Sequence, residues 1–163
     1  LWDIQEAGQQ LLAEHGYLQY EVSAYARAGH QARHNLNYWS FGDFIGIGAG
    51  AHGKLSSPSG QIVRTWKTRL PKDYLDPDKA FLAGERALTS EELPFEFLMN
   101  VLRLNDGCSS ALFTQRTGLP LSVLSAARAE AEARGLLLRD PQRLAASREG
   151  QLFLNDLLQY FLT

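Results

Sequence analysis

The sequence predicts an α/β fold in its first part and a small, mostly helical domain in its last part. Two observations support this prediction. Residues 2–53 show the order helix, strand, long loop and strand, which is typical of α/β barrels and doubly wound sheets. Residues 93–163 contain three helical stretches, a hairpin and a further helix, which is the order of a winged-helix-like domain.

A helix is expected over residues 2–15, and a strand is expected directly after it. Asp3 and Glu6 have the spacing of a capping box, and Gly16 is placed to end the helix. Residues 17–23 are rich in β-forming side chains, so they predict the strand.

Residues 24–42 are expected to form a long loop, because they combine glycines with polar and basic side chains. Residues 44–48 are a short apolar run, which predicts a buried strand leading into a glycine-rich segment. Residues 61–68 alternate in polarity, which predicts a strand at a sheet edge or in a hairpin. These elements place the first predicted domain at residues 1–70.

Residues 71–92 are expected to be a helical linker, because they contain two prolines and end on the capping-box spacing from Thr89 to Glu92. Residues 93–163 form the last predicted domain. Its first helix, which begins near Pro94, is apolar nearly all round and should lie at the centre of a small core. Further helices are expected at 109–117, 122–134 and 148–162, with a hairpin at 136–144.

The charge of the chain gives no support for a nucleic-acid partner. The 163 residues are 45% hydrophobic, and 16 basic against 18 acidic side chains give a net charge of -2. Residues 95–163 hold seven arginines, no lysine and seven acidic residues, so the helical domain has no surplus positive charge to neutralise phosphates. We therefore expect no binding to nucleic acid, although DNA binding is a common use of the winged-helix order.

Other features of the composition concern location. No apolar run reaches the roughly 18 residues that span a bilayer, so no transmembrane segment is expected. Cys108 is the single cysteine, and a lone thiol is typical of a reducing, cytoplasmic compartment. Met99 is the single methionine and the chain begins with leucine, so we expect it to be a fragment of a longer protein or a processed chain.

The densest group of chemically useful side chains is residues 34–39, with the sequence HNLNYW, next to Arg33. An imidazole, amides and two large aromatic rings can stack on a flat ring and ligate iron, and Arg33 can pair with a carboxylate. The alternative is structural: Tyr38 and Trp39 anchor a core, while His34 and Asn35 satisfy loop backbone groups.

A second candidate segment is rich in glycine. Gly46, Gly48, Gly50 and Gly53 let the backbone approach a ligand closely or adopt positive φ. The segment is not a phosphate loop, because no Gly-Lys-Ser/Thr follows. A tight structural turn explains the glycines equally well.

Three segments in this order resemble signatures of the radical-SAM family of oxygen-independent coproporphyrinogen III oxidases. They are YEVSAYA at 20–26, HNLNYW at 34–39 and GIGAGAHG at 46–53. The second is similar to the motif of the haem-chaperone branch of that family. LPFEFLMN at 93–100 resembles the closing domain of the same family. Ala24 departs from the asparagine found in many relatives, so no side-chain contact is carried over to that position.

The resemblance implies that residues 1–70 are the C-terminal part of a partial (β/α)6 radical-SAM barrel. It implies that Glu21 and Ser23 point into the barrel lumen from one strand. Gly46, Gly48 and Gly50 would close the end of the barrel that holds S-adenosylmethionine. The full-length protein would carry a [4Fe–4S] cluster on three cysteines, which this chain lacks, so the chain alone is expected to be catalytically inert.

The resemblance also implies a function for the full-length protein, which would bind haem and deliver it to respiratory acceptor proteins. Five residues are the expected haem contacts: Arg33, His34, Asn35, Tyr38 and Trp39. One alternative is oxidative decarboxylation of coproporphyrinogen III by a radical-SAM oxidoreductase, and another is a stand-alone winged-helix binding module. The unpaired strand edge of a truncated barrel predicts self-association of the isolated chain.

Overall fold

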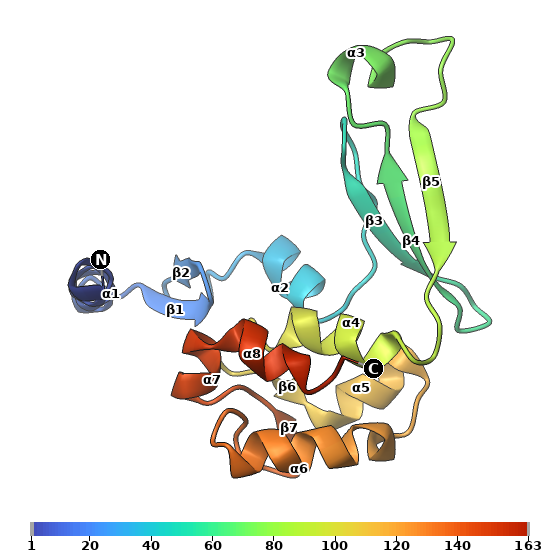
Figure 1. Cartoon of the computed structure of the whole chain (residues 1–163). Coiled ribbons are helices and arrows are strands. Elements are labelled where there is room, and N and C mark those ends of the chain that lie inside the picture. Colours follow the sequence, from blue (N-terminus) through green and yellow to red (C-terminus); the bar gives the residue numbers. More distant parts are fainter. Residues whose placement is uncertain (1, 163) are drawn as a thin grey trace.

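A three-stranded sheet projects like an arm from a helical body in the computed structural model, which describes residues 2–162 (Figure 1). Residues 1 and 163, the outer ends of the two predicted domains, lie outside the described residues. The mixed α/β class expected from the sequence is confirmed. No helix in residues 2–162 is both long enough and apolar enough to cross a membrane.

The N-terminal elements are a helix, a small hairpin and a second helix. Helix α1 ends before Gly16, whose φ is 79°, as the sequence predicts. The prediction of a long loop at 24–42 is wrong, because these residues contain a strand and a helix. Strands β1 and β2 pair in antiparallel fashion. The bounds are α1 Trp2–Glu14, β1 Leu18–Glu21, β2 Ala24–Ala26 and α2 Arg33–Trp39.

The arm is an antiparallel sheet in the order β3-β4-β5, with α3 at its far end (Figure 1). The bounds are β3 His52–Ser56, β4 Ile62–Lys67, α3 Pro71–Tyr74 and β5 Leu82–Ala87. The strand predicted at 61–68 is confirmed, and it is the central strand of the sheet. Its hairpin with β3 is also confirmed. Every strand pair in residues 2–162 is antiparallel.

Two predictions in this region are wrong. Residues 44–48 do not form a buried strand, because Phe44 makes a single bridge to Lys54 while the side chains of Ile45 and Ile47 are 73% and 83% exposed. Residues 71–92 are not a helical linker, because they contain β5. That strand lacks an alternating apolar pattern and forms because β4 offers it an edge.

The helical body contains the remaining elements, and most sequence-predicted helices are confirmed within a few residues. Ser109 caps α5 by accepting a hydrogen bond from the Ala111 N–H, and Gly118 ends it at φ 73°. Leu137 bridges Ala146 across the expected hairpin. The predicted last helix is broken at Phe153. The bounds are α4 Leu93–Val101, β6 Cys108–Ser109, α5 Ser110–Thr117, η1 Leu121–Leu124, α6 Ser125–Ala133, β7 Arg143–Leu144, α7 Arg148–Leu152 and α8 Leu154–Gln159.

Three phenylalanines link the helical body to the chain that follows α2. Phe97 in α4 is fully buried and lies edge-to-face with Phe41 and Phe113, at ring centroid distances of 5.5 and 5.2 Å. Phe41 has a φ of 56°, which is uncommon for a residue with a side chain. Burial of its ring holds this conformation, so the end of α2 is fixed relative to the core.

Candidate binding cleft

A cleft of about 450 Å³ lies between α2 and the segment that leads into β3. It joins two of the motifs that the sequence singled out, although they are separated along the chain. Its residues combine two imidazoles, a phenol and several apolar side chains. They are His34, Tyr38, Phe44, Ile45, Gly46, Ile47, Ala51 and His52.

Helix α2 sets the positions of His34 and Tyr38. The two residues are four apart, so a helix places them on the same face. Two hydrogen bonds connect the helix to other parts of the chain: Asn35 Nδ2 donates to Tyr20 Oη at 3.0 Å, and Asn37 Nδ2 donates to the Asp43 carbonyl at 2.9 Å. Helix α2 is therefore held mainly by tertiary contacts.

The glycine-rich segment forms the other wall, and its glycines have structural reasons. A Cβ on Gly46 would lie 2.2 Å from the His52 carbonyl oxygen, and one on Gly53 would lie 2.6 Å from Thr65 Oγ1. Gly48 and Gly50 have φ of 108° and 71°, which suits glycine. The structural explanation of the glycines therefore holds for this packing, and the packing brings Ile47 and His52 to the cleft.

Substituting Gly46 with alanine is expected to destabilise the protein by roughly 1–3 kcal/mol, the usual cost of forcing atoms into filled space. The added carbon would push the 44–48 segment away from His52 in β3 and distort the cleft. Chemical denaturation measures the cost. Gly8→Ala is the matched control, because nothing lies within 4 Å of its added carbon, and it should be neutral or stabilising. Equal effects of the two substitutions would contradict the packing argument.

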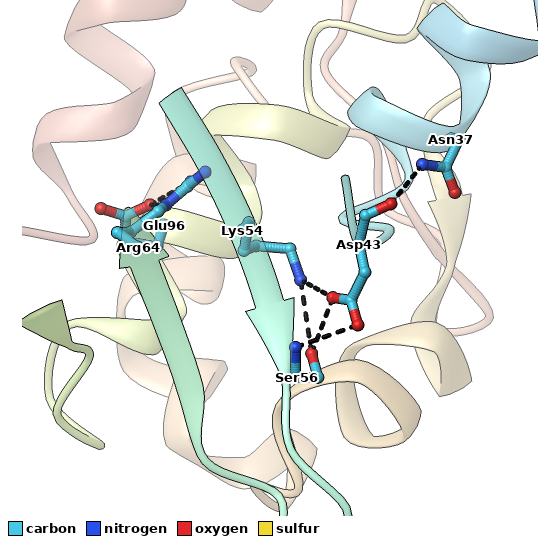
Figure 2. Close-up of polar contacts among 6 residues, drawn as sticks. All are labelled: Asn37, Asp43, Lys54, Ser56, Arg64 and Glu96. Atoms are coloured by element: carbon cyan, nitrogen blue, oxygen red, sulfur yellow. Dashed lines mark hydrogen bonds and ion pairs between the residues drawn. The ribbon is translucent and has the colours of Figure 1, made fainter. Parts of the chain in front are cut away.

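An ion pair between the buried Lys54 and the partly exposed Asp43 lies next to the cleft (Figure 2). Lys54 is 1% exposed, and its ammonium donates to Asp43 Oδ1 at 2.8 Å and lies 4.3 Å from the centre of the Phe41 ring. Asp43 also accepts from the Ser56 N–H and hydroxyl, both at 2.9 Å. The sequence analysis did not predict this pair. The one indication of it in the sequence is that single charged residues, Asp43 and Lys54, stand on either side of the apolar, glycine-rich residues 44–53.

Burial and pairing act in opposite directions on this pair. Burial lowers the pKa of Lys54, and the neighbouring Asp43 only partly opposes it. Burial alone would raise the pKa of Asp43, but hydrogen bonds from Lys54 and Ser56 outweigh it, and the pKa of Asp43 is lowered. The lowered pKa keeps the Asp43 carboxylate ionised near neutral pH.

Three cations form a row across one face of the arm, because Lys54, Arg64 and Arg86 are directly paired in register on β3, β4 and β5. Each forms an ion pair, and the Arg64 guanidinium lies 2.5 Å from Glu96 (Figure 2). The pair of Lys54 joins the base of the arm to the segment that follows α2, and the pairs of Arg64 and Arg86 join it to α4 and its N-cap. The acidic partners are Asp43, Glu96 and Glu92, in that order.

Other predicted site residues lie outside the cleft lining. Arg33 is exposed on α2. Trp39 packs against Arg103, whose guanidinium carbon is 4.4 Å from the indole ring centre, and lies edge-to-face with Tyr38 at 4.6 Å. Asn35 is occupied by Tyr20. The structure therefore brings His34 and Tyr38 to the cleft and leaves the other three beside or behind it.

The prediction that Glu21 and Ser23 share one face of a strand is wrong, because Ser23 lies in the turn between β1 and β2. The two residues nevertheless touch: the Ser23 N–H and hydroxyl donate to Glu21 Oε1 at 2.9 and 2.8 Å. Glu21 is 2% exposed and pairs with Arg103 at 3.4 Å. Its carboxylate therefore links the hairpin to the end of α4.

Residues 2–162 contain no group of three potential metal ligands. The single thiol, Cys108, is partly buried, and burial raises its pKa to about 12. One cysteine does not fit the ligand set of an iron–sulfur cluster.

Cys108 is expected to react with iodoacetamide at pH 8 at least about tenfold more slowly in the folded protein than in urea, because the thiolate is the reactive form. The raised pKa of Cys108 reduces the thiolate fraction strongly, and the greater nucleophilicity of a high-pKa thiolate offsets only part of the loss. Mass spectrometry of the alkylated protein measures both rates. Equal rates would mean that the thiol is accessible and ordinary.

Residues 88–153 match the family described as the HemN C-terminal domain. This match agrees with the resemblance of residues 93–100 to the closing domain of that family. The chain is similar over its length to the haem chaperone HemW of Escherichia coli (strain K12): it is 47% identical over 99% of this chain and 42% of that protein. It is 45% identical to the haem chaperone HemW of Haemophilus influenzae, over 100% of this chain and 42% of that protein.

The fold is also found in a solved structure, described as coproporphyrinogen III oxidase (HemN) from Escherichia coli, a radical SAM enzyme. The TM-score is 0.67 at 16% identity, over 99% of this chain and 41% of that one. This similarity concerns the fold. The chain spans about two-fifths of the length of the curated relatives it matches.

Proposed function

We propose that this chain contributes the haem-contact cleft of a haem chaperone, which in full length binds haem and delivers it to respiratory acceptor proteins. The observation that carries the proposal is that one cleft contains His34 and Tyr38 together with the exposed side chains of Ile45 and Ile47. The names of the HemW relatives support it.

The cleft suits the chemistry of haem. The porphyrin is a flat apolar ring, and Ile45 and Ile47 offer apolar surface that is otherwise costly to expose. Tyr38 offers an aromatic ring, and His34 offers an imidazole for iron. Arg33 is exposed one residue before His34 and is proposed to pair with a propionate. Asn35 and Trp39 are proposed to contribute without touching haem, by fixing the position of α2 through their contacts with Tyr20 and Arg103.

The architecture of the whole protein is part of the same proposal. Residues 1–70 are proposed to be the last elements of a partial (β/α)6 radical-SAM barrel, whose S-adenosylmethionine end the 46–50 segment closes. Residues 93–163 are proposed to be a winged-helix-like domain. S-adenosylmethionine and a [4Fe–4S] cluster would be held by parts of the protein beyond this chain, in a cytoplasmic protein.

The fold shared with coproporphyrinogen III oxidase keeps oxidative decarboxylation as a second candidate. The two functions differ in that the oxidase consumes coproporphyrinogen III, whereas a chaperone only binds and transfers haem. Incubating the full-length protein with coproporphyrinogen III, S-adenosylmethionine and a reductant tests the enzyme, and release of carbon dioxide would favour it over the chaperone.

His34→Ala is expected to weaken haem binding by about tenfold or more and to shift the Soret band, because an iron ligand is lost. Absorption titration of the full-length protein with hemin measures both. His15→Ala is the matched control, because that imidazole lies at the end of α1 and contacts the Leu11 carbonyl oxygen. A wild-type affinity and spectrum in a folded His34→Ala protein would show that the motif is structural.

A further inference from the structure

His52 is a second imidazole in the cleft, and it comes from a different element than His34. It is the first residue of β3, 18 positions after His34 in the sequence. Its side chain is exposed. Within residues 2–162 its ring makes no hydrogen bond, whereas the ring of His15 contacts a backbone carbonyl. The His52 imidazole is therefore free to bind a ligand.

The backbone of His52 is held firmly. Its carbonyl oxygen packs against Gly46, where a Cβ would approach to 2.2 Å, and it pairs with Trp66 in the central strand. Two residues further along the same face, Lys54 is buried and bound to Asp43. The strand that carries His52 is therefore fixed by packing, hydrogen bonding and an ion pair.

We propose that His52 is a second iron ligand of the bound haem, so that His34 and His52 occupy the two axial positions. This inference rests on the proposed function. Two imidazoles that border one cleft from separate elements can approach a flat ring from its two faces, which neighbouring residues on one helix face cannot. Ile45 and Ile47 line the same cleft and would offer apolar surface to the porphyrin.

Two axial histidines also explain how the cargo is both held and released. Ligation by two imidazoles would fill both axial positions of the iron. An acceptor could then replace one imidazole while the other still held the iron. Each exchange breaks one iron–nitrogen bond and forms one iron–ligand bond, with no change in oxidation state.

The test is hemin titration of the full-length protein in imidazole-free buffer, followed by absorption and electron paramagnetic resonance spectroscopy. Wild type is expected to give six-coordinate, low-spin ferric haem. His52→Ala is expected to give five-coordinate, high-spin haem with about tenfold weaker binding. His52→Met, which offers a thioether ligand, should restore six-coordination with a shifted spectrum. The double variant His34→Ala/His52→Ala should no longer shift the Soret band of hemin relative to free hemin.

His30→Ala is the matched control. His30 borders a separate hollow with Tyr17, Tyr25 and Arg27, so its loss should leave the spectrum unchanged. Thermal melting by circular dichroism confirms that each variant folds. A five-coordinate wild-type spectrum, or an unchanged spectrum in folded His52→Ala, overturns the assignment of His52. Absence of hemin binding by wild type overturns the proposed function as well, so the two failures are distinguishable.

Discussion

Asp43→Ala is expected to destabilise the protein by about 3 kcal/mol, because it leaves the buried Lys54 ammonium without its counter-charge. Lys54 is 1% exposed, and it would keep only the Phe41 ring at 4.3 Å and the Ser56 hydroxyl at 3.5 Å. The expected loss lies at the lower end of the range for broken buried pairs, because the Asp43 side chain is 41% exposed and water can partly replace it. Urea denaturation followed by circular dichroism measures the loss.

The pH dependence of this loss identifies its cause. With Asp43 removed, burial lowers the pKa of Lys54 further, so the unfolded state binds more protons than the folded state above neutral pH. Stability of Asp43→Ala should therefore recover partly as pH rises toward 10. The wild type should also lose stability as pH falls below about 4, the ordinary pKa of an aspartate, and continue to lose it until the lower pKa that Asp43 has in the folded protein is passed.

The matched control replaces both partners. Lys54→Met with Asp43→Ala removes the charge together with its partner and should be more stable than Asp43→Ala alone. If Asp43→Ala costs less than about 0.5 kcal/mol at neutral pH, the pair does not hold the base of the arm.

Local signals predicted the elements that rest on local interactions. Helix α5 begins at the Ser109 cap and ends at Gly118, and both ends can be read from single residues. The alternation at 61–68 predicted β4 because a strand shows its two faces in its own sequence. These elements form where the sequence expects them.

The elements that were missed depend on distant partners. Helix α2 has no side-chain cap and is held by Tyr20, 15 residues before Asn35. Strand β5 has mostly exposed residues and a glycine beneath Trp66, where a Cβ would meet the indole at 2.4 Å. No local pattern encodes such contacts, because they join residues that lie far apart in the sequence.

The candidate site was predictable in its residue types but not in its arrangement. The sequence identified His34 and Tyr38, yet it placed them in a loop. A loop does not predict that two residues four positions apart lie on the same side, as they do in α2. It also identified the glycine-rich segment without showing that His52 and Ile47 would meet α2. The fold brings these residues together through Phe41, whose buried ring sets the path of the chain between the two motifs.

Trp39→Ala is expected to cost about 3 kcal/mol of stability, at the lower end of the range for large aromatic side chains, because the indole is only partly buried. The indole lies under Arg103, 4.4 Å from its guanidinium carbon, and edge-to-face with Tyr38. Arg103 also pairs with the buried Glu21, so Trp39 belongs to the contact that joins α2, the β1–β2 hairpin and α4. Chemical denaturation of the full-length protein measures the loss.

A double-mutant cycle with Arg103→Met separates this packing role from haem contact. Trp39 and Arg103 should show a coupling free energy of about 1 kcal/mol, as expected for a partly buried cation–π pair. The ion pair between Glu21 and Arg103 is absent from both variants that lack Arg103, so its contribution to stability cancels in the cycle. At temperatures where Trp39→Ala is folded, hemin binding should keep the wild-type Soret band, because Trp39 does not line the cleft. Normal stability combined with weakened hemin binding would instead make the indole a stacking face for the porphyrin.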